Sequence, residues 1–588
     1  MRVLKNNLKP LGVAALLGVA FCLALIISNQ IFLHLLGLSD PSWAPRLLLE
    51  SSLDVWGVDG LQRKWVFSLI APFAVLGSIF VLGFKVNHKF LFGHAHWATL
   101  WEARASGILA KEGLILGKRW GKYLRVSGFE HVFVFAPSGS GKTNALVTPN
   151  LFAWEGSCIV QDIKLSLFKI TSGYREQVLK QKCFIWNPGS RHRQTHAYNP
   201  IDAISRDPFL RTDDLQKIAN ILIPDNPKQD PIWTAQPRQL FVAILLYLLD
   251  TPSRPATLGE MVRVIKNTPN FSKWITDTLE KRKDLDPLCY RNFLSFAQTE
   301  YRLQTNILQS FLSYFELFDN PLIDAATHHS DFDIRQLKKE KMTIYVGVSS
   351  DNLSRLAPLL TVFYQQVLDH ALRELPIPEE EPHGILLLLD EFSALRRMEV
   401  LQKGIGLMRE YRVRVMAIIQ DLPQLYETYG HDGAKAFINN KYRVAFAPND
   451  LDAARLISGW LGETTVESRS QNQKLWGGLF QDSQSLSYVK RPLMNPDEIM
   501  KLSKDKMIIT LEGANPVLAF KNPWYGDSTF ATREMDPISI PVLEPTLAPF
   551  DHEALSKAMK ALDEKEVPHE KQSNKAKDSG IINEEKVD

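Results

Sequence analysis

Residues 131–143 read H-V-F-V-F-A-P-S-G-S-G-K-T, and this stretch decides the fold that we expect. Residues 132–135 are apolar, with β-branched and aromatic side chains, which is typical of a short buried strand. The N-A-L-V that follows can continue as a helix, so a glycine-rich loop joins a strand to a helix start. Backbone N–H groups of such a loop and the positive end of the helix can cradle phosphate groups. The sequence therefore predicts a phosphate-binding loop; a polar turn that contains G-K-T by chance is the alternative.

The residues of this loop have separate expected roles. Lys142 would reach the β- and γ-phosphates of a nucleotide, and the Thr143 hydroxyl would help to hold Mg²⁺. Ala136 stands where the usual pattern has its first glycine. A Cβ costs little there if φ is negative, so the loop can tolerate it. The predicted nucleotide-binding residues are Pro137, Ser138, Gly139, Ser140, Gly141, Lys142 and Thr143.

A second apolar run, G-I-L-L-L-L at 384–389, ends in the two carboxylates Asp390 and Glu391. In a P-loop ATPase, Asp390 would orient the hydration shell of Mg²⁺ and Glu391 would polarise the attacking water. A core strand capped by acids explains the run equally well when it is taken alone. Because it follows a phosphate-binding loop in the same chain, we expect an ATPase that uses ATP and Mg²⁺.

A third apolar run, Val413–Ile419, predicts another central strand, and it ends at Gln420. An amide at the tip of this strand could sense a γ-phosphate; a strand-end cap is the alternative. Just upstream, M-R-E-Y-R-V-R holds three arginines, and any of them could be an arginine finger supplied to a neighbouring subunit or a solvated surface charge. The candidates are Arg409, Arg412 and Arg414.

The loop lysine and the acidic strand lie far apart in sequence, since 390 − 142 = 248 residues separate them. That is too many for a bare α/β core, and the intervening stretch contains long helical patterns with few strand signals. We therefore expect an α/β nucleotide-binding domain in two parts, 85–206 and 326–548, with an all-α domain at 207–325 inserted between them.

The N-terminal 84 residues are expected to be a membrane anchor. Two runs without charge, at about 11–33 and 65–84, are each long enough to cross the hydrocarbon core at ~1.5 Å per residue. A cleaved signal peptide is the alternative for the first run. Basic residues precede the first run and follow the second, which predicts cytoplasmic ends and an external loop at 34–64. The shorter run Leu240–Leu249 predicts a buried helix instead.

Composition narrows the class of protein. The chain has 588 residues, 45% of them hydrophobic, and a net charge of 68 − 65 = +3, which excludes a disordered chain and a histone-like basic protein. Its four cysteines show no CxxC spacing, which argues against a zinc site and a disulfide framework. His94 and His96 have no third ligand nearby, so we expect no metal there. Residues 549–588 are highly charged and predict a disordered tail, with a docking segment as the alternative.

These motifs together resemble the TraG-like type IV coupling proteins, the membrane ATPases of conjugation and type IV secretion. The resemblance runs from the first apolar run to about residue 530, in the order that the family shows. One departure is D-I-K-L-S at 162–166, where the family commonly has D-x-K-G-E. The matching stretches are G-H-A-H-W-A at 93–98, A-P-S-G-S-G-K-T at 136–143, T-S-G-Y-R at 171–175, Y-N-P at 198–200, S-D-F-D at 330–333, L-L-D-E-F-S-A-L-R-R-M at 388–398, Q-D-L-P-Q-L at 420–425 and R-P-L-M-N-P-D-E-I at 491–499.

The resemblance implies a RecA-like P-loop ATPase domain with an inserted all-α domain and two N-terminal transmembrane helices. It further implies a homo-hexameric ring in the bacterial inner membrane, with the N-terminus, the ATPase domain and the tail in the cytoplasm. By family position, Arg409 becomes the arginine-finger candidate, beside Glu391 and Gln420 as the other catalytic residues and Thr143 and Asp390 as the Mg²⁺ ligands.

The function implied is a coupling ATPase that drives single-stranded DNA bound to its relaxase toward the components of the secretion channel. Three alternatives remain at this point. The same fold could act as a receptor and ATPase for effector-protein export, as an FtsK-type DNA translocase, or as a docking receptor without catalysis. The intact Lys142, Thr143, Asp390 and Glu391 argue against the last.

Overall fold

The computed structural model describes residues 21–36, 61–84, 92–349, 351–392, 397–472 and 483–545. The chain divides into two compact units, Met1–His94 with Thr465–Val489, and Ala95–Thr464 with Lys490–Asp588. The predicted tail at 549–588, most of the predicted external loop and the first ten residues of the predicted first span lie outside the described residues.

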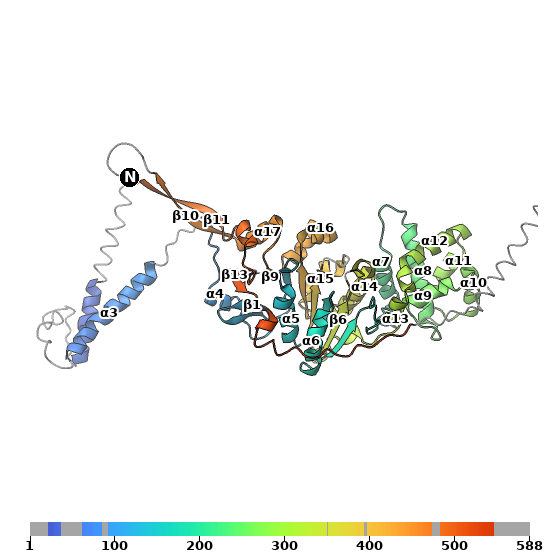
Figure 1. Ribbon diagram of the computed structural model, residues 1–588, viewed down its shortest axis with the longest axis horizontal. Coiled ribbons are helices and arrows are strands. Elements are labelled where there is room, and N and C mark those ends of the chain that lie inside the picture. The colour runs from blue at the N-terminus through green and yellow to red at the C-terminus, as the bar shows by residue number, and fades with distance from the viewer. Residues whose placement is uncertain are drawn as a thin grey trace, which may run out of the picture. The chain divides into compact units, whose positions relative to one another are not determined.

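The larger unit contains a mixed sheet of eleven strands (Figure 1). Its strands are β1 Leu114–Arg119, β2 Lys122–Val126, β3 Val132–Phe135, β4 Ser157–Asp162, β5 Lys182–Trp186, β6 Met342–Gly347, β7 Ile385–Asp390, β8 Val413–Ile419, β9 Tyr442–Ala445, β12 Lys506–Leu511 and β13 Val517–Phe520. Their order in the sheet is β2-β1-β13-β12-β9-β3-β8-β7-β4-β6-β5. From β9 to β5 the neighbours are parallel, and from β9 to β2 they are antiparallel. The three predicted strands are β3, β7 and β8.

Both faces of the parallel strands are buried, because successive side chains point to opposite faces and both sets are apolar. On β3, Phe133 and Phe135 belong to one hydrophobic cluster, while Val132 and Val134 belong to another. The second cluster includes Leu146 and other residues from the helices that follow the glycine-rich loop and β4. A fully apolar run such as that of β7 is therefore what this position in the sheet requires.

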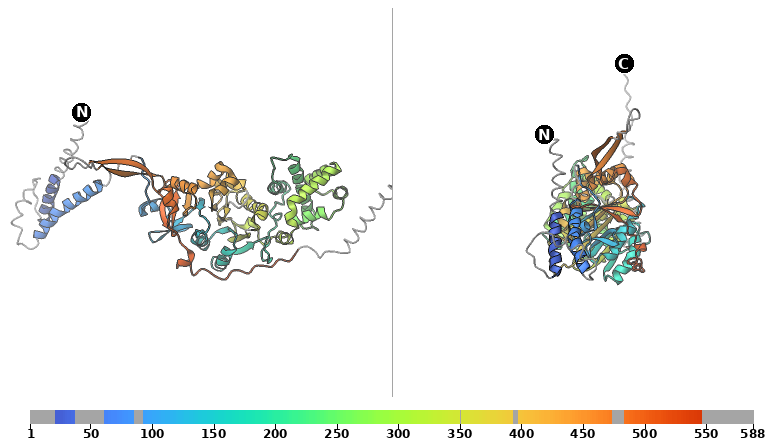
Figure 2. Two further views of the ribbon diagram at one scale, coloured as in Figure 1. Left: turned by 45° about the horizontal axis from the view of Figure 1, so that its top comes forward. Right: turned by 90° about the vertical axis from the view of Figure 1, so that its left-hand side faces the viewer.

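The helices that flank the sheet are α4 Leu100–Ala105, the π-helical turn η1 Thr143–Val147, α5 Thr148–Ala153, α6 Ser166–Gln177, η3 Ile334–Gln336, α14 Leu353–Ala371, α15 Glu399–Met408, α16 Leu422–Ile438, α17 Leu451–Leu461, α18 Pro496–Met500 and η5 Trp524–Gly526. Between β5 and β6 the described residues form no further strand of the sheet, and η3 is preceded there by the helices α7 Arg211–Leu222, α8 Ile232–Leu249, α9 Leu258–Lys266, α10 Phe271–Lys281, α11 Pro287–Ala297, α12 Tyr301–Phe315, η2 Glu316–Asp319 and α13 Pro321–Ala326. Helices α8 to α12 gather at one end of the larger unit (Figures 1 and 2).

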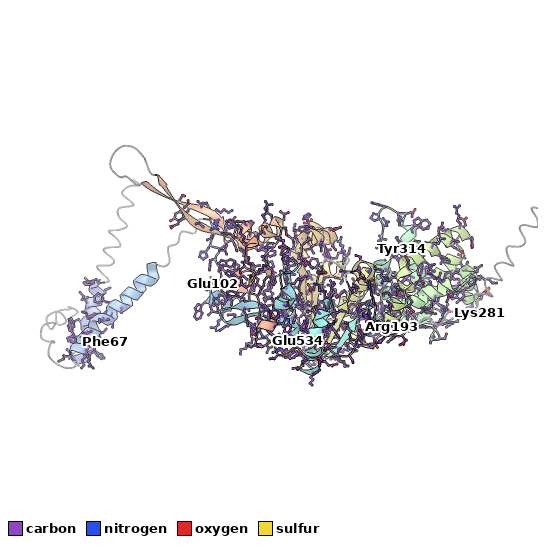
Figure 3. The ribbon with its side chains drawn as sticks, in the orientation of Figure 1. Phe67, Glu102, Arg193, Lys281, Tyr314 and Glu534 are labelled. Carbon is purple, nitrogen blue, oxygen red and sulfur yellow. The ribbon has the colours of Figure 1, made fainter. Side chains whose placement is uncertain are left out.

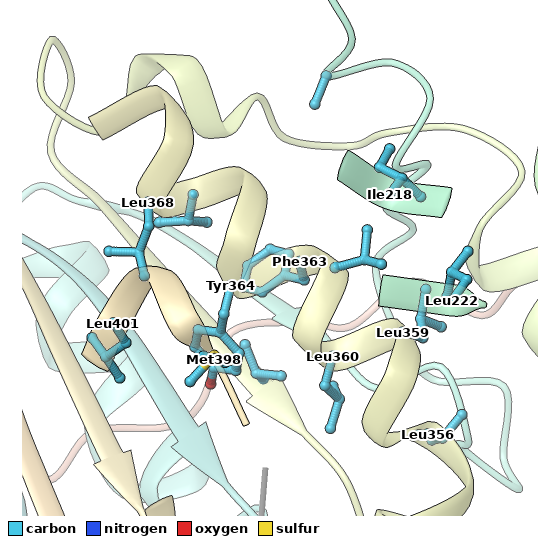
Figure 4. Packing of buried hydrophobic residues seen from close by; sticks show 14 of the residues in the cluster. Ile218, Leu222, Leu356, Leu359, Leu360, Phe363, Tyr364, Leu368, Met398 and Leu401 are labelled. Atoms are coloured by element: carbon cyan, nitrogen blue, oxygen red, sulfur yellow. The ribbon is translucent and has the colours of Figure 1, made fainter. Parts of the chain in front are cut away.

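Helix α14 connects this helical block with the sheet domain. Its apolar side chains are buried on both sides, so the two parts share one hydrophobic core. In Figure 4, Leu359 lies on the side of α14 that faces Leu222 of α7. Leu368 lies on the side that faces Leu401 of α15. Helix α8 lies inside the block and is almost entirely buried from Leu240 to Leu248, as its uncharged run predicts.

One helix among the described residues, α8, is long and apolar enough to cross a membrane by length and composition, and most of it is buried within the protein. The two predicted spans do not meet this criterion. The first overlaps the shorter apolar helix Phe21–Leu36, and the second falls within α3, Leu61–Phe84.

In the smaller unit these two helices pack together through Phe32, Leu61 and Trp65. The strands β10 Glu463–Asn472 and β11 Ser483–Pro492 pair with each other, and only part of each belongs to this unit. The hydroxyl of Thr465 accepts a hydrogen bond from the backbone N–H of Phe92 at 3.1 Å, which ties β10 to the segment after α3.

An extended segment, residues 535–545, runs along the larger unit from near Glu534 to Arg193, both labelled in Figure 3. Thr195 donates its backbone N–H to the carbonyl of Pro541, and Leu543 donates to that of Arg193. The segment also crosses α6 at Gly173, where a Cβ would lie 2.1 Å from the carbonyl oxygen of Asp536. Glycine in the T-S-G-Y-R stretch is therefore required by a close backbone approach.

We expect Gly173→Ala to displace the segment 535–545, because the new methyl group would overlap the backbone of Asp536. The free energy of unfolding should fall by about 1–3 kcal/mol, and limited proteolysis should cut this segment faster. Gly459→Ala is the control, since Gly459 is also helical but is exposed and has no atom within 4 Å of a built Cβ. Equal cleavage rates for the two variants would contradict the proposed clash.

Candidate nucleotide-binding site

The glycine-rich loop connects β3 to the π-helical turn η1. Gly139 and Gly141 have φ values of 71° and 83°, which L side chains rarely adopt, so both glycines are required by the loop conformation. Ala136 is not among the residues with positive φ, and its backbone N–H donates to the carbonyl of Ile419 at 2.9 Å. The alanine therefore extends the strand, and alanine in place of the usual first glycine causes no backbone strain.

The turn after the loop is wider than an α-helix. The backbone N–H of Thr148 donates to the carbonyl of Thr143, five residues earlier. Pro149 follows, and it lacks the N–H that an α-helix would use while its ring crowds the carbonyl four residues before it. The widened turn accommodates this proline immediately after the phosphate-binding loop, a placement common at functional sites.

Lys142 lies against the acidic end of β7. Its Nζ is 2.9 Å from Oδ1 of Asp390, and the two side chains are only 10% and 18% exposed. The strand order explains this contact, because β8 alone separates β3 from β7 and all three are parallel. Their carboxyl ends therefore meet at one edge of the sheet, which brings the loop lysine and the acid pair together.

Gln420 lies at the tip of β8, between the loop and the acids. Its Nε2 donates a hydrogen bond to Oε1 of Glu391. Glu391 has a φ of 65°, a left-handed conformation that costs a residue with a side chain about 1–3 kcal/mol. Strain of this size at the end of a central strand persists only where neighbouring structure holds it, and it is frequent at functional sites.

Asp162, at the tip of the neighbouring strand β4, joins this group. Burial raises its pKa to about 6, and the nearby Asp390 carboxylate adds to the shift. Its two oxygens accept hydrogen bonds from the backbone N–H groups of Ser166 and Phe168, so the carboxylate also begins α6. The sequence singled out this residue as part of a family motif and assigned no role to it.

Leu165 occupies the place where the resemblance leads us to expect glycine. Its φ is 54°, so the backbone keeps the conformation that glycine favours. A Cβ on Gly347 would lie 2.5 Å from Cδ2 of Leu165, so the absence of a side chain there makes room for the leucine. The backbone at Leu165 and the space at Gly347 therefore accommodate leucine where the motif has glycine.

The three arginines upstream of β8 differ in their surroundings. Arg414 is fully buried and donates to the carbonyls of Val126, Gly128 and Glu130. Arg412 donates to two other carbonyls, those of residues 381 and 382. Both guanidinium groups therefore stabilise the fold by donating hydrogen bonds to backbone carbonyls.

Arg409 caps the end of α15 and is exposed. It lies at the amino edge of β8, the opposite edge from Gln420. The seven residues of β8 at ~3.3 Å each put about 20 Å between these edges. The structure thus brings together the loop, Asp390, Glu391 and Gln420, but it keeps Arg409 away from them.

Oxygen atoms suited to a small hard cation are present at the loop. The Thr143 hydroxyl and the Asp390 carboxylate are both partly exposed, and Mg²⁺ binds through one or two such groups together with phosphate oxygens and water. The two residues therefore fit a magnesium ion. At the N-terminal histidines, no group of metal-binding side chains is found in the described parts of the chain, and His96 is 2.8 Å from Oε1 of Glu102.

The family described as type IV secretory system conjugative DNA transfer matches residues 96–542. The chain is 30% identical over 479 residues to the protein VirD4 of Rhizobium radiobacter, an alignment that covers 78% of this chain and 67% of that protein. It is 27% identical over 511 residues to the conjugal transfer protein TraG of Escherichia coli, covering 77% and 79%.

Solved structures of the coupling protein TrwB share the fold. A complex of TrwB with ADP and Mg²⁺ has a TM-score of 0.54 at 18% identity and covers 74% of this chain and 96% of that one. A complex with the ATP analogue ADPNP has a TM-score of 0.55 at 16% identity and covers 79% and 99%. The α/β fold expected from the three strands is thus that of a known nucleotide-binding protein.

The contact between Lys142 and Asp390 can be measured as a coupling energy. We expect Lys142→Ala, Asp390→Ala and the double variant to give a coupling of about 1–3 kcal/mol in the free energy of unfolding, because the pair is mostly shielded from water. A cycle on the exposed pair of Glu399 and Lys403 is the control, and it should give at most about 0.5 kcal/mol. Additive effects at the first pair would show that the two groups do not interact.

Proposed function

This chain belongs to the type IV secretory system family of conjugative DNA transfer, and from this premise we propose that it is a coupling ATPase of the bacterial inner membrane. It recruits single-stranded DNA with its bound relaxase and drives the complex toward the secretion channel. The observation that carries the proposal is the convergence of the loop lysine, Lys142, with Asp390 and Glu391 at one edge of the sheet.

Each residue at this edge has a role in hydrolysis. Lys142 and the loop N–H groups would bind the β- and γ-phosphates, and Thr143 and Asp390 would hold the metal ion. Glu391 accepts a hydrogen bond from Gln420. It follows β7, which lies beside β8, and β8 in turn lies beside β3, the strand before the loop. There it can orient and polarise a water molecule, and Gln420 couples its position to the γ-phosphate. The nucleotide and metal in the TrwB complexes support ATP and Mg²⁺ as the cofactors.

The position of Arg409 supports a ring of subunits, and the family resemblance makes that ring a hexamer. Arg409 is exposed on the opposite edge of the sheet from its own phosphate-binding loop. Because it lies away from its own loop, we assign it to the nucleotide site of a neighbouring subunit, where its charge would stabilise the transition state.

The helices Phe21–Leu36 and α3 are proposed to be membrane spans, despite their failure of the length-and-composition criterion. Large apolar side chains, among them Phe21, Phe67 and Ile70, point outward and are more than half exposed, and Figure 3 labels Phe67. The polar side chains of Ser28 and Ser68 are buried instead. Apolar groups outside and small polar groups inside are typical of helices that pack within lipid.

The direct test is the ATPase activity of the full chain in detergent, with and without single-stranded DNA, at increasing salt. We expect DNA to stimulate hydrolysis and the stimulation to fall steeply with salt, because phosphate contacts dominate such binding. Glu391→Gln should bind nucleotide but lose at least about 10²-fold in turnover. Stimulation by a secreted protein and not by DNA would favour effector export, and an inactive wild-type chain would contradict the ATPase.

The arginine finger has its own test. Arg409→Ala should leave nucleotide binding unchanged and reduce turnover in assembled rings by about 10³-fold. Mixing this variant with Glu391→Gln subunits, which keep their Arg409, should restore part of the activity because the finger acts between subunits. Arg455→Ala, an exposed arginine on α17, is the control. Failure of the mixture to recover any activity would argue against a finger at this position.

A further inference from the structure

Lys521 follows β13 directly and lies at the same edge of the sheet as the glycine-rich loop. Strands β13 and β9 both pair antiparallel with β12, and β9 is parallel to β3. The carboxyl end of β13 therefore faces the same way as that of β3, where the loop begins. No sequence pattern singled out this lysine, because strands β12 and β13 come more than 360 residues after the loop.

The side chain of Lys521 contacts the loop itself. Its Nζ donates a hydrogen bond to the backbone carbonyl of Ser140 at 2.8 Å. The same ammonium group lies 4.1 Å from the ring centroid of Phe446, which directly follows β9 and is fully buried. The backbone N–H of Phe446 donates to Phe135 at the end of β3, so the ring beneath the lysine is fixed to the loop strand.

The charge of Lys521 has no acidic partner in contact. Among the ion pairs of the described residues, none involves Lys521. Burial lowers the pKa of its ammonium group, and the nearby Asp505 carboxylate opposes this shift only in part. The carbonyl of Ser140 uses one of its three N–H donors, and the aromatic face stabilises part of the charge. A cation that is partly removed from water without a counter-ion is costly unless an anion binds near it.

The loop that Lys521 touches is the part of the molecule built to receive an anion. Lys142, at the end of the same loop, already faces the Asp390 carboxylate. Lys521 has no carboxylate in contact, and the nearby Asp505 offsets only part of its charge, so the remainder acts on the loop. A polyphosphate bound by the loop N–H groups would supply the missing negative charge.

We propose that Lys521 is a positioning residue for nucleoside di- and triphosphates, which holds the loop at Ser140 and adds positive charge to the phosphate site. This inference rests on the proposed function, since it concerns the same nucleotide site. Because Lys521 acts on bound nucleotide before and during hydrolysis alike, its loss raises KM and leaves kcat nearly unchanged.

The test uses the full chain in detergent and a fluorescent ADP analogue with Mg²⁺ as the probe. Lys521→Met keeps most of the apolar part of the side chain but removes the charge and the donor, and we expect affinity to fall by about tenfold, the size of a charge-assisted hydrogen bond. Lys521→Arg should restore most of the affinity. Lys521→Gln keeps a donor for the Ser140 carbonyl without the charge, and it should still bind less tightly than wild type.

Two controls separate this inference from the alternatives. Lys504→Met removes an exposed charge just before the start of β12 and should change neither affinity nor KM. The thermal midpoint of each variant without nucleotide reports on folding, and a purely structural lysine would lower it without changing the salt dependence of binding. Affinity and KM within twofold of wild type in Lys521→Met and Lys521→Gln would overturn the proposal. A wild-type chain that binds no probe would instead contradict the nucleotide site as a whole.

Discussion

The parallel order β3-β8-β7 is the constraint on which the rest of the structure depends. Parallel strands end at a common edge, so three loops that are distant in sequence must meet there. Lys142 comes from the first, Gln420 from the second, and the pair of Asp390 and Glu391 from the third. A second strand between β3 and β7, in addition to β8, would separate the lysine from the acids, and the ion pair at 2.9 Å would not form.

Much of this edge could be predicted because each piece carries a local signal. A run of apolar residues that ends in a polar one, as at Val413–Ile419 with Gln420, marks both a buried strand and its tip. Two glycines in G-S-G-K mark a loop with left-handed backbone, and Gly139 and Gly141 have that conformation. The helical stretch between β5 and β6 follows from its periodic apolar positions in the same way.

Other features depend on contacts that no local pattern encodes. Arg409, Arg412 and Arg414 look alike in sequence, and only their depth in the fold separates the two that bind backbone carbonyls from the exposed one. Lys521 reaches the loop because β12 and β13 extend the sheet by antiparallel pairing, which a single sequence does not specify. The membrane prediction rests on composition, whereas the outward apolar faces of Phe67 and Ile70 come from the packing of two helices.

The balance of acidic and basic side chains at this edge determines how well it can bind phosphate. The carboxylates of Asp390 and Glu391 are proposed to hold the metal ion and to polarise water, yet both repel a polyphosphate. Lys142 offsets one of them through its ion pair, and burial keeps Asp162, with a pKa of about 6, from ionising as readily as an exposed aspartate. Without a further cation the residues at this edge would present more negative than positive charge to the nucleotide. Lys521 is the basic side chain that contacts the loop from outside this acid cluster, and its charge shifts the balance toward phosphate binding.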